Sequence, residues 1–275
     1  MMTAPLSSLD LDDTRKAFDA AAGVYDVAYE DLPGIRRFRM LTREIYLRFF
    51  PPTGTLLDLN CGTGNDSIYL ARRGFHILGA DISGGMIERA QAKVASEGLD
   101  EFVQAIVLPF HGLSSLHGKT FDGAYSNMGG LNCSDSLGTI ARDLADLLRP
   151  GGYFIATVMP SFCLWETLAA LARGNGQLAF RRHSADGTIA NVHGGNVRTF
   201  YYSPSRMKNL FAPYFEHVKT TALGVILPPP NHVRAYKLLG RSLHLLEGLD
   251  TLLSQFVLSS FVSDHYVMVL RRKRL

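Results

Sequence analysis

Short apolar runs alternate with longer amphipathic runs along the first part of the chain. Runs typical of buried strands occupy residues 55–60, 76–82, 102–108, 121–126 and 153–159. Between them, apolar positions recur every three or four residues, as they do in helices that pack on a sheet. Because strands joined by helices run parallel, the alternation predicts an α/β, doubly wound sheet with helices on both faces.

The flanking regions break this alternation. Residues 1–13 carry no pattern of regular structure, and helical spacing then predicts helices over 14–26 and 34–50. Beyond the fifth strand, a glycine-rich stretch rich in aromatic residues and arginine indicates an insertion, before a helix at 205–214, strands at 215–227 and 265–270, and a helical region at 233–258. We therefore predict one domain over 1–275: an N-terminal helical arm (1–52), a ligand-binding core (53–159), a cap insertion (160–202), and a completion of the core (203–275) with a helical insertion (228–260).

Composition and charge narrow the class of protein. The 275 residues carry 28 Lys plus Arg against 25 Asp plus Glu, a formal net charge of +3, so no nucleic-acid partner is expected. The three cysteines, Cys61, Cys133 and Cys163, are far apart and form no CxxC pair, which predicts neither a metal site nor disulfides.

Nothing in the sequence predicts secretion or a membrane span. The N-terminus lacks the basic and apolar regions of a signal peptide, and the apolar stretch 243–262 is interrupted by charged and amide residues. We expect a cytoplasmic protein without a transmembrane segment. Peripheral membrane contact stays open, as does the choice between a monomer and a homodimer.

The stretch that follows the first predicted strand indicates a ligand site. Gly62 and Gly64 form a turn between that strand and a helix, where a bare backbone lets a ligand approach and free N–H groups favour a negative group. Asp81 ends the second strand, beside the first, where a carboxylate can accept hydrogen bonds from both hydroxyls of a ribose. The three residues together predict a cofactor that contains a nucleoside.

A family resemblance narrows the choice of nucleoside. Position 67 is Ser67 rather than the third glycine of a dinucleotide turn, and the sequence Asp58-Leu-Asn-Cys-Gly-Thr-Gly resembles motif I of class I S-adenosylmethionine-dependent methyltransferases. Further segments resemble the same family, and in particular its small-molecule, UbiE-like (type 11) group: 18–26, Asp81-Ile-Ser, Leu108-Pro109-Phe110, 121–127 and 147–152.

The resemblance implies a fold, a cofactor and a set of contacts. The fold is a Rossmann-like seven-stranded sheet in the order 3-2-1-4-5-7-6, with the last strand antiparallel, and the cofactor is S-adenosyl-L-methionine. The implied cofactor-binding residues are Tyr25, Asp58, Asn60, Gly62, Gly64, Asp81, Ile82, Ile106, Val107 and Asn127.

Two positions depart from the family pattern. Asn60 stands where the family has the first glycine of motif I, and we expect its backbone to tolerate a positive φ. The acid near the end of the third strand, which meets the adenine amino group, is absent from Gln104-Ala105-Ile106-Val107. A backbone carbonyl or Gln104 could take its place.

The chemistry of methyl transfer limits which further residues are required. Transfer from a sulfonium is an in-line displacement with a neutral leaving group, so alignment and exclusion of water supply most of the acceleration. A general base is needed only if the acceptor carries a proton, and the candidates in predicted substrate loops are His111, His193 and His232. The sequence does not identify the catalytic residues or the acceptor atom.

The aromatic residues of the cap insertion suggest a class of acceptor. They could line a pocket for a planar or lipid-like small molecule, with Arg181, Arg182 and Arg198 meeting a carboxylate or phosphate, or they could only pack the cap onto the core. The residues concerned are Phe162, Trp165, Phe180, Phe200, Tyr201 and Tyr202. Two other functions stay open: a non-catalytic S-adenosylmethionine-binding or scaffold protein, and an NAD-dependent oxidoreductase.

Overall fold

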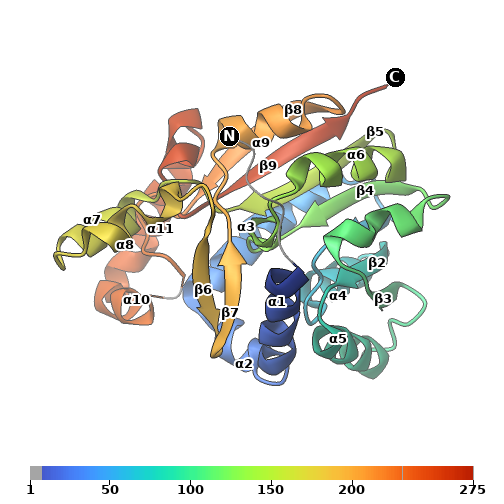
Figure 1. The fold of residues 1–275 in the computed structure, drawn as a ribbon, viewed down its shortest axis with the longest axis horizontal. Helices are drawn as coiled ribbons and strands as arrows, with labels where there is room; N and C mark the ends of the chain where they lie inside the picture. Colours follow the sequence, from blue (N-terminus) through green and yellow to red (C-terminus); the bar gives the residue numbers. More distant parts are fainter. Residues whose placement is uncertain (1–7, 231, 275) are drawn as a thin grey trace.

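The computed structural model describes residues 8–230 and 232–274. Its centre is a seven-stranded sheet in the order β3-β2-β1-β4-β5-β9-β8 (Figure 1). The first five strands pair in parallel, and β9 runs antiparallel to both of its neighbours. This arrangement confirms the predicted order and the antiparallel last strand. The strands are β1 (Thr55–Asp58), β2 (His76–Asp81), β3 (Val103–Val107), β4 (Phe121–Ser126), β5 (Leu148–Val158), β8 (Phe215–Leu223) and β9 (His265–Arg272).

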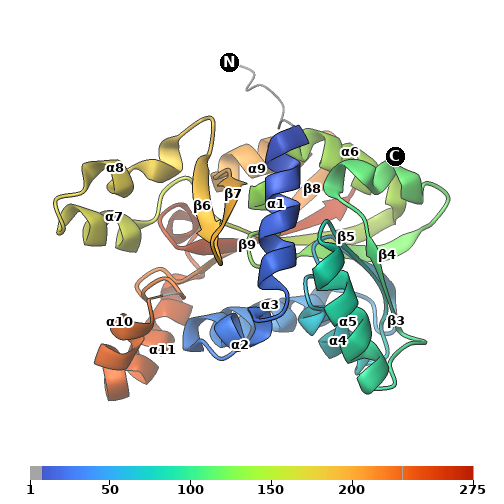
Figure 2. The ribbon, with the colours of Figure 1, turned by 60° about the horizontal axis from the view of Figure 1, so that its bottom comes forward.

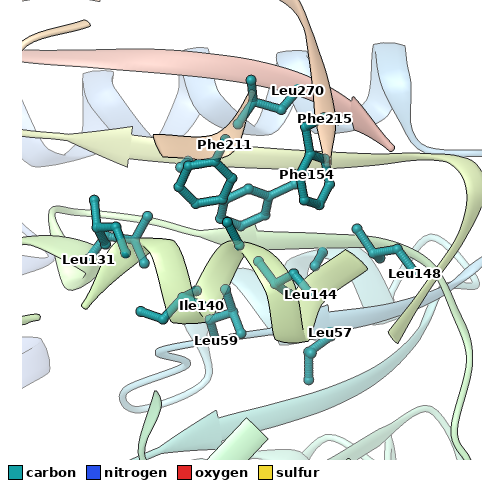
Figure 3. Close-up of a cluster of buried hydrophobic side chains, with 14 of the residues drawn as sticks. Leu57, Leu59, Leu131, Ile140, Leu144, Leu148, Phe154, Phe211, Phe215 and Leu270 are labelled. Carbon is teal, nitrogen blue, oxygen red and sulfur yellow. The ribbon is translucent and has the colours of Figure 1, made fainter. Parts of the chain in front are cut away.

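Helices cover both faces of the sheet, so each face has its own apolar core. On one face, α3 (Pro33–Phe49), α4 (Asn65–Ala71) and α5 (Gly84–Ser96) pack through a cluster that includes Phe38 and Tyr46. On the other face lie η1 (Phe110–Leu116), α6 (Leu137–Leu147) and α9 (Pro204–Phe211). Figure 3 shows how Phe154 of β5 meets Phe211 and Phe215 there, with ring centroids 5.4 Å and 6.3 Å away.

The N-terminal arm begins earlier than the sequence pattern suggests. Helix α1 spans Ser8–Ala21 and α2 spans Tyr25–Tyr29, so the prediction of no regular structure before residue 14 was wrong from residue 8 onward; residues 1–7 lie outside the described part. Asp12 pairs with both Arg15 and Lys16 one turn away, which favours the helix despite its short apolar stripe. Helix α1 lies between α5 and a two-stranded hairpin (Figure 2).

That hairpin belongs to the glycine-rich segment after β5. Helices α7 (Leu164–Leu171) and α8 (Gly176–Ala179) come first, followed by a short turn, η3 (Arg181–His183), and strands β6 (Thr188–Val192) and β7 (Gly195–Thr199). The hairpin was not predicted, because its strands alternate weakly between polar and apolar positions. Gly195 brings β7 against α1, since a Cβ at that position would overlap Ala17.

The predicted strand over 215–227 ends four residues early, at Leu223. Gly224 has a positive φ of 68°, and the N–H groups of Val225 and Ile226 turn away to the carboxylate of Asp250, at 2.7 Å and 2.9 Å. Asp250 lies on α11 (Leu243–Leu253). This helix comes after α10 (Val233–Leu239) and η4 (Gly240–Ser242), and η5 (Val257–Phe261) follows it. A buried side chain distant in sequence therefore ends the strand.

Candidate cofactor and acceptor site

The carboxyl ends of β1, β2 and β4 open into a cavity of about 320 Å³. Helices α1 and α2 close it from the opposite side, through Leu11, Thr14, Phe18 and Tyr25. Of the predicted residues, those that line the cavity are Tyr25, Asp58, Asn60, Gly62, Asp81, Ile82, Asn127 and His111. Local strand–turn–helix order therefore places most of the predicted cofactor residues around one space.

Asp81 has the geometry of a ribose-binding acid. One carboxylate oxygen accepts the N–H of Gly62 at 2.9 Å, and the other accepts the N–H of Ser83 at 2.9 Å. Each oxygen keeps further capacity to accept a hydrogen bond, and Asp81 lines the cavity. Burial raises the pKa of Asp81 to about 6 despite these two hydrogen bonds, so the carboxylate is ionised at neutral pH and titrates just below it.

The glycine turn leaves room for a ligand, although its N–H groups are less free than predicted. Gly62 has φ 53°, and no atom lies within 4 Å of the point where its Cβ would be. Since Gly62 lines the cavity, that space fits a group bound against the backbone. Its N–H is engaged by Asp81, however, and Gly64 serves as the left-handed N-cap of α4 without lining the cavity.

Asn60 preserves the turn without adopting a positive φ. The non-glycine residues with positive φ are Thr53, Met128 and His193 within the described part of the chain, so the tolerance for positive φ that was expected of Asn60 is not used. Its side chain instead joins β1 to β4: Nδ2 donates to the carbonyl of Asn127 at 2.9 Å, and Oδ1 accepts from the hydroxyl of Ser126. Gly130 is bare at this point because a Cβ there would overlap the Asn60 amide.

Asp58 lies beneath the turn. Ser67 donates its hydroxyl to Asp58 at 2.8 Å and also lies 3.2 Å from the Tyr125 hydroxyl. Burial raises the pKa of Asp58 to about 7. Ser67 stands where a dinucleotide-binding turn has its third glycine. In this structure it is the hydrogen-bond partner of Asp58, the acid of motif I.

An ion-pair network that the sequence pattern does not indicate lies at the same end of the cavity. Arg39 of α3 lines the cavity and pairs with Asp66 at 2.6 Å and with Glu30 at 2.8 Å, while Asp66 also accepts from Arg43 and Asn127. Burial would raise the pKa of Asp66, but the two guanidinium groups outweigh it and hold that pKa below its usual value. The buried Arg39 Nε has no hydrogen-bond partner, so this cavity-lining guanidinium keeps one unused donor.

Two aspartates fasten the N-terminal arm over the cavity. Asp19 of α1 accepts from the Ser83 hydroxyl at 2.6 Å and from the Gly85 N–H at 3.0 Å. Asp26 of α2 accepts from Thr63 at 2.6 Å and pairs with Lys93 at 3.0 Å. Thr63 and Ser83 lie in the turns that follow β1 and β2, and Lys93 lies on α5, so the arm is held in part by the same loops that line the site.

The predicted adenine contacts are not at the cavity. Ile106 and Val107 do not line it, and Val107 is 56% exposed. Gln104 is exposed and lines a separate open groove beside α5, so it does not replace the missing acid. The polar groups that do reach the cavity from this side belong to the loop before α6, which the sequence did not single out: Ser134, Asp135, Ser136 and Thr139.

The aromatic residues of the cap do not line the cavity either. Phe200 and Tyr202 belong to the core beside α6, and the Tyr202 hydroxyl donates to the carbonyl of Ser134, whereas Phe180 is exposed. The apolar cavity wall comes instead from α1, the loop after β3, and α6, through Leu11, Phe18, Leu108, Phe110 and Ile140. None of the six cap aromatics therefore lines this cavity, and the buried ones, such as Phe200 and Tyr202, pack in the core.

The three cap arginines are engaged in ion pairs. Arg181 and Arg182 both pair with Glu166, and Arg182 also reaches Asp264 at 2.8 Å. Arg198 pairs with Asp10 of α1 at 2.9 Å. These arginines join the cap to β9 and to the arm, and none of them lines the cavity.

Only one of the three candidate histidines lines the cavity. His111 does so, at the start of η1. His193 is exposed in the β6–β7 turn with its ring against Tyr29, and His232 packs against Trp165. Cys133 also lines the cavity, but burial raises the pKa of its thiol to about 12, so it is not a thiolate at neutral pH.

The sheet order, the glycine turn and the carboxylate of Asp81 together define a class I S-adenosylmethionine-dependent methyltransferase. Residues 56–152 match the family described as a methyltransferase domain. The UbiE ubiquinone/menaquinone biosynthesis C-methyltransferase of Acidiphilium cryptum is 32% identical over 176 residues, which cover 58% of this chain and 68% of that protein. The chain therefore belongs to this family, whose cofactor is S-adenosylmethionine.

Other relatives extend the comparison over more of the chain. A malonyl-[acyl-carrier protein] O-methyltransferase of Methylovorus sp. is 26% identical over 239 residues, 82% of this chain and 74% of that protein. Among the first curated relatives the chain covers from 49% to 74% of their length. The crystal structure of 1,6-didemethyltoxoflavin-N1-methyltransferase of Burkholderia thailandensis, with S-adenosylhomocysteine bound, has a TM-score of 0.60 at 19% identity, over 98% of this chain and 92% of that one, which shows the shared fold.

Proposed function

We propose that the protein transfers the methyl group of S-adenosylmethionine to a small, predominantly apolar acceptor, aromatic or lipid-like. The observation that carries this proposal is the division of one cavity into two kinds of wall. Charged and polar groups gather at the strand ends, at Asp58, Asp81 and Arg39, whereas α1 faces them with Leu11 and Phe18. A polar cofactor suits the first wall and an apolar acceptor suits the second.

The residues at the strand ends fit the cofactor. Asp81 would accept both ribose hydroxyls, Gly62 leaves space for the chain that follows, and Arg39 would meet a carboxylate. When bound, S-adenosylmethionine supplies an activated methyl group on a sulfonium. The arm residues then exclude water and align the acceptor, and His111 is the cavity histidine that could accept an acceptor proton.

The named relatives support an apolar acceptor class without identifying it. The UbiE protein is named for ubiquinone and menaquinone biosynthesis, and the second relative for malonyl-acyl carrier protein. Quinone precursors are largely apolar rings, whereas a malonyl thioester is a short acyl group with a nucleophilic carboxylate. We extend to this chain only the apolar acceptor class suggested by the first relative, and neither particular substrate.

The test has two stages. Calorimetry with S-adenosylhomocysteine and with NAD should show binding of the first and none of the second. Production of S-adenosylhomocysteine is then measured with three probe classes: substituted phenols and quinols, fatty acids, and aromatic nitrogen heterocycles. Cofactor binding without turnover on any probe would favour a scaffold protein over an enzyme.

Variants locate the acceptor wall. Leu11→Ser on α1 should raise the KM for an active probe about tenfold while the S-adenosylhomocysteine affinity stays within about twofold, since burial of one leucine is worth about 1.5 kcal/mol or more. Trp165→Ala is the matched control, because Trp165 does not line the cavity. An unchanged KM in Leu11→Ser, or an equal rise in Trp165→Ala, would contradict the assigned wall.

A further inference from the structure

Exposed apolar side chains gather in two segments that the cofactor site does not use. Eighteen large hydrophobic residues are exposed within residues 8–230 and 232–274, and eleven of them lie in just 164–180 and 238–258. A cluster of exposed apolar side chains is typical of an interaction site, whereas apolar side chains that are exposed singly are common on any protein surface. The eleven are Leu164, Leu168, Leu171, Phe180, Leu238, Leu245, Leu249, Leu252, Phe256, Val257 and Leu258.

Helix α11 carries its apolar face outward. Leu245, Leu249 and Leu252 are spaced by four and three residues, which places them on one side of the helix, and Leu245 is 80% exposed. The inner side carries the partly buried Leu246 and Leu253 and is also held by polar contacts: Asp250 accepts backbone N–H groups, and Arg37 donates to the carbonyl of Glu247 at 2.7 Å. The helix therefore carries leucines on both sides, and those of the outer side have no cover within the described part of the chain.

Helix α7 repeats this arrangement, and the two segments are neighbours. Leu164, Leu168 and Leu171 share one exposed side of α7. The N–H of Leu164 donates to the carbonyl of Val262, just after η5, at 2.9 Å, and Trp165 packs on His232, just before α10. Figures 1 and 2 both place α7, α8, α10 and α11 at the same end of the molecule.

The charges around these side chains identify the partner. Among the described lysine, arginine, aspartate and glutamate side chains of 164–183 and 233–258, the exposed ones are Arg173, Arg234 and Lys237. Arg234 is four residues from Leu238 on α10, so a cation and an exposed leucine share one helix face. The acids of these segments, Glu166, Glu247 and Asp250, lie at least partly buried and are engaged with arginine or backbone groups. Apolar side chains flanked by cations are complementary to an anionic bilayer surface.

We propose that this end of the molecule, residues 164–180 and 234–258, docks onto anionic lipid bilayers. The leucine and phenylalanine side chains enter the boundary between headgroups and acyl chains, and Arg173, Arg234 and Lys237 contact lipid phosphates. A second copy of this chain fits less well, because the cations would approach their own copies across a twofold contact. The docking is a property of the surface and does not depend on the proposed acceptor.

The experiment measures vesicle binding of the full chain. Flotation with vesicles of phosphatidylglycerol and phosphatidylcholine in equal parts should recover the protein, and pure phosphatidylcholine vesicles should recover far less. Leu245→Ser combined with Leu252→Ser and Phe256→Ser should reduce the partition coefficient at least about tenfold, since each change removes membrane-buried apolar surface. The double variant Arg234→Gln, Lys237→Gln should also bind anionic vesicles more weakly. Added salt should reduce the binding of this variant less than it reduces the binding of wild type.

Matched controls separate docking from folding and from other partners. Leu47→Ser lies outside both segments and should leave vesicle binding unchanged, while circular dichroism and S-adenosylhomocysteine binding confirm that each variant is folded. The proposal is overturned if wild type fails to float, if the triple serine variant floats equally, or if neutral vesicles bind as well as anionic ones. A wild-type dimer that the triple variant converts to a monomer, without vesicle binding, would assign the surface to a second copy instead.

Discussion

Replacing Asp81 by asparagine tests the cofactor site at the residue on which its assignment depends most. The side chain keeps its size, but the ionised acceptor is lost and one oxygen becomes an N–H donor that faces the Ser83 or Gly62 N–H. A hydrogen bond to a charged group is worth about 1.5–3 kcal/mol, so S-adenosylhomocysteine should bind about tenfold to about 150-fold more weakly.

The pKa of Asp81 adds a second, independent expectation. Because burial raises that pKa to about 6, the free protein takes up a proton here as the pH falls below neutrality. Ribose hydroxyls donate to the ionised form, so binding favours the deprotonated state, and affinity is fully present above about pH 6 and lost as the pH falls through it. The wild-type affinity should be about five- to tenfold weaker at pH 5 than at pH 7.5.

Calorimetric titration with S-adenosylhomocysteine across this range gives both quantities. Asp58 also titrates near neutral pH, with a pKa of about 7, so the informative quantity is the difference between the wild-type and Asp81→Asn curves, in which any contribution of Asp58 cancels. Asp100→Asn, at an exposed turn, is the matched control. An affinity in Asp81→Asn equal to that of wild type, or parallel pH curves for the two proteins, would refute the assignment of Asp81.

Three further predictions concern the supports of the site. Gly130→Ala should lower the free energy of unfolding in urea by about 1–3 kcal/mol because its Cβ overlaps Asn60, and Asn60→Gly in the same chain should restore part of that loss; additive effects would contradict the contact. Asp26→Ala removes the contacts of the arm with Thr63 and Lys93, so S-adenosylhomocysteine should dissociate faster in stopped-flow measurements while the melting temperature changes little. An unchanged dissociation rate would show that the arm does not hold the cofactor. Arg182→Met should cost about 3–5 kcal/mol at pH 7.5, because the buried Glu166 and Asp264 each lose one of their cationic partners, and less at pH 4.5, where Asp264 without its arginine is more readily protonated. A loss that grows in acid would refute this account.

The sequence alone determined the alternation of strands and helices and the cofactor end of the site. Strand, glycine turn, helix and strand follow one another within thirty or so residues, and parallel strands have their carboxyl ends at one edge. Gly62 and Asp81 therefore had to meet, whatever the rest of the chain did. Resemblance to the family then supplied the order of the strands and the antiparallel direction of the last one, which the pattern of a single strand does not encode.

Only the tertiary structure decided which side chains reach the cavity from elsewhere. The Asn60 amide packs against Gly130, which lies 70 residues further along the chain, and Arg39 of another helix pairs with Asp66. Asp250 accepts the N–H groups that end β8, a strand that the sequence pattern would have extended. The aromatic residues of the cap have the composition of a pocket and yet pack in the core or face solvent. Helical spacing predicts that Leu245, Leu249 and Leu252 share a face of α11, but whether that face is covered depends on which side of the helix finds partners, and here the side of Asp250 found them. Periodicity is a local property of the chain, whereas orientation depends on contacts between segments far apart in sequence, and the sequence pattern does not carry those contacts.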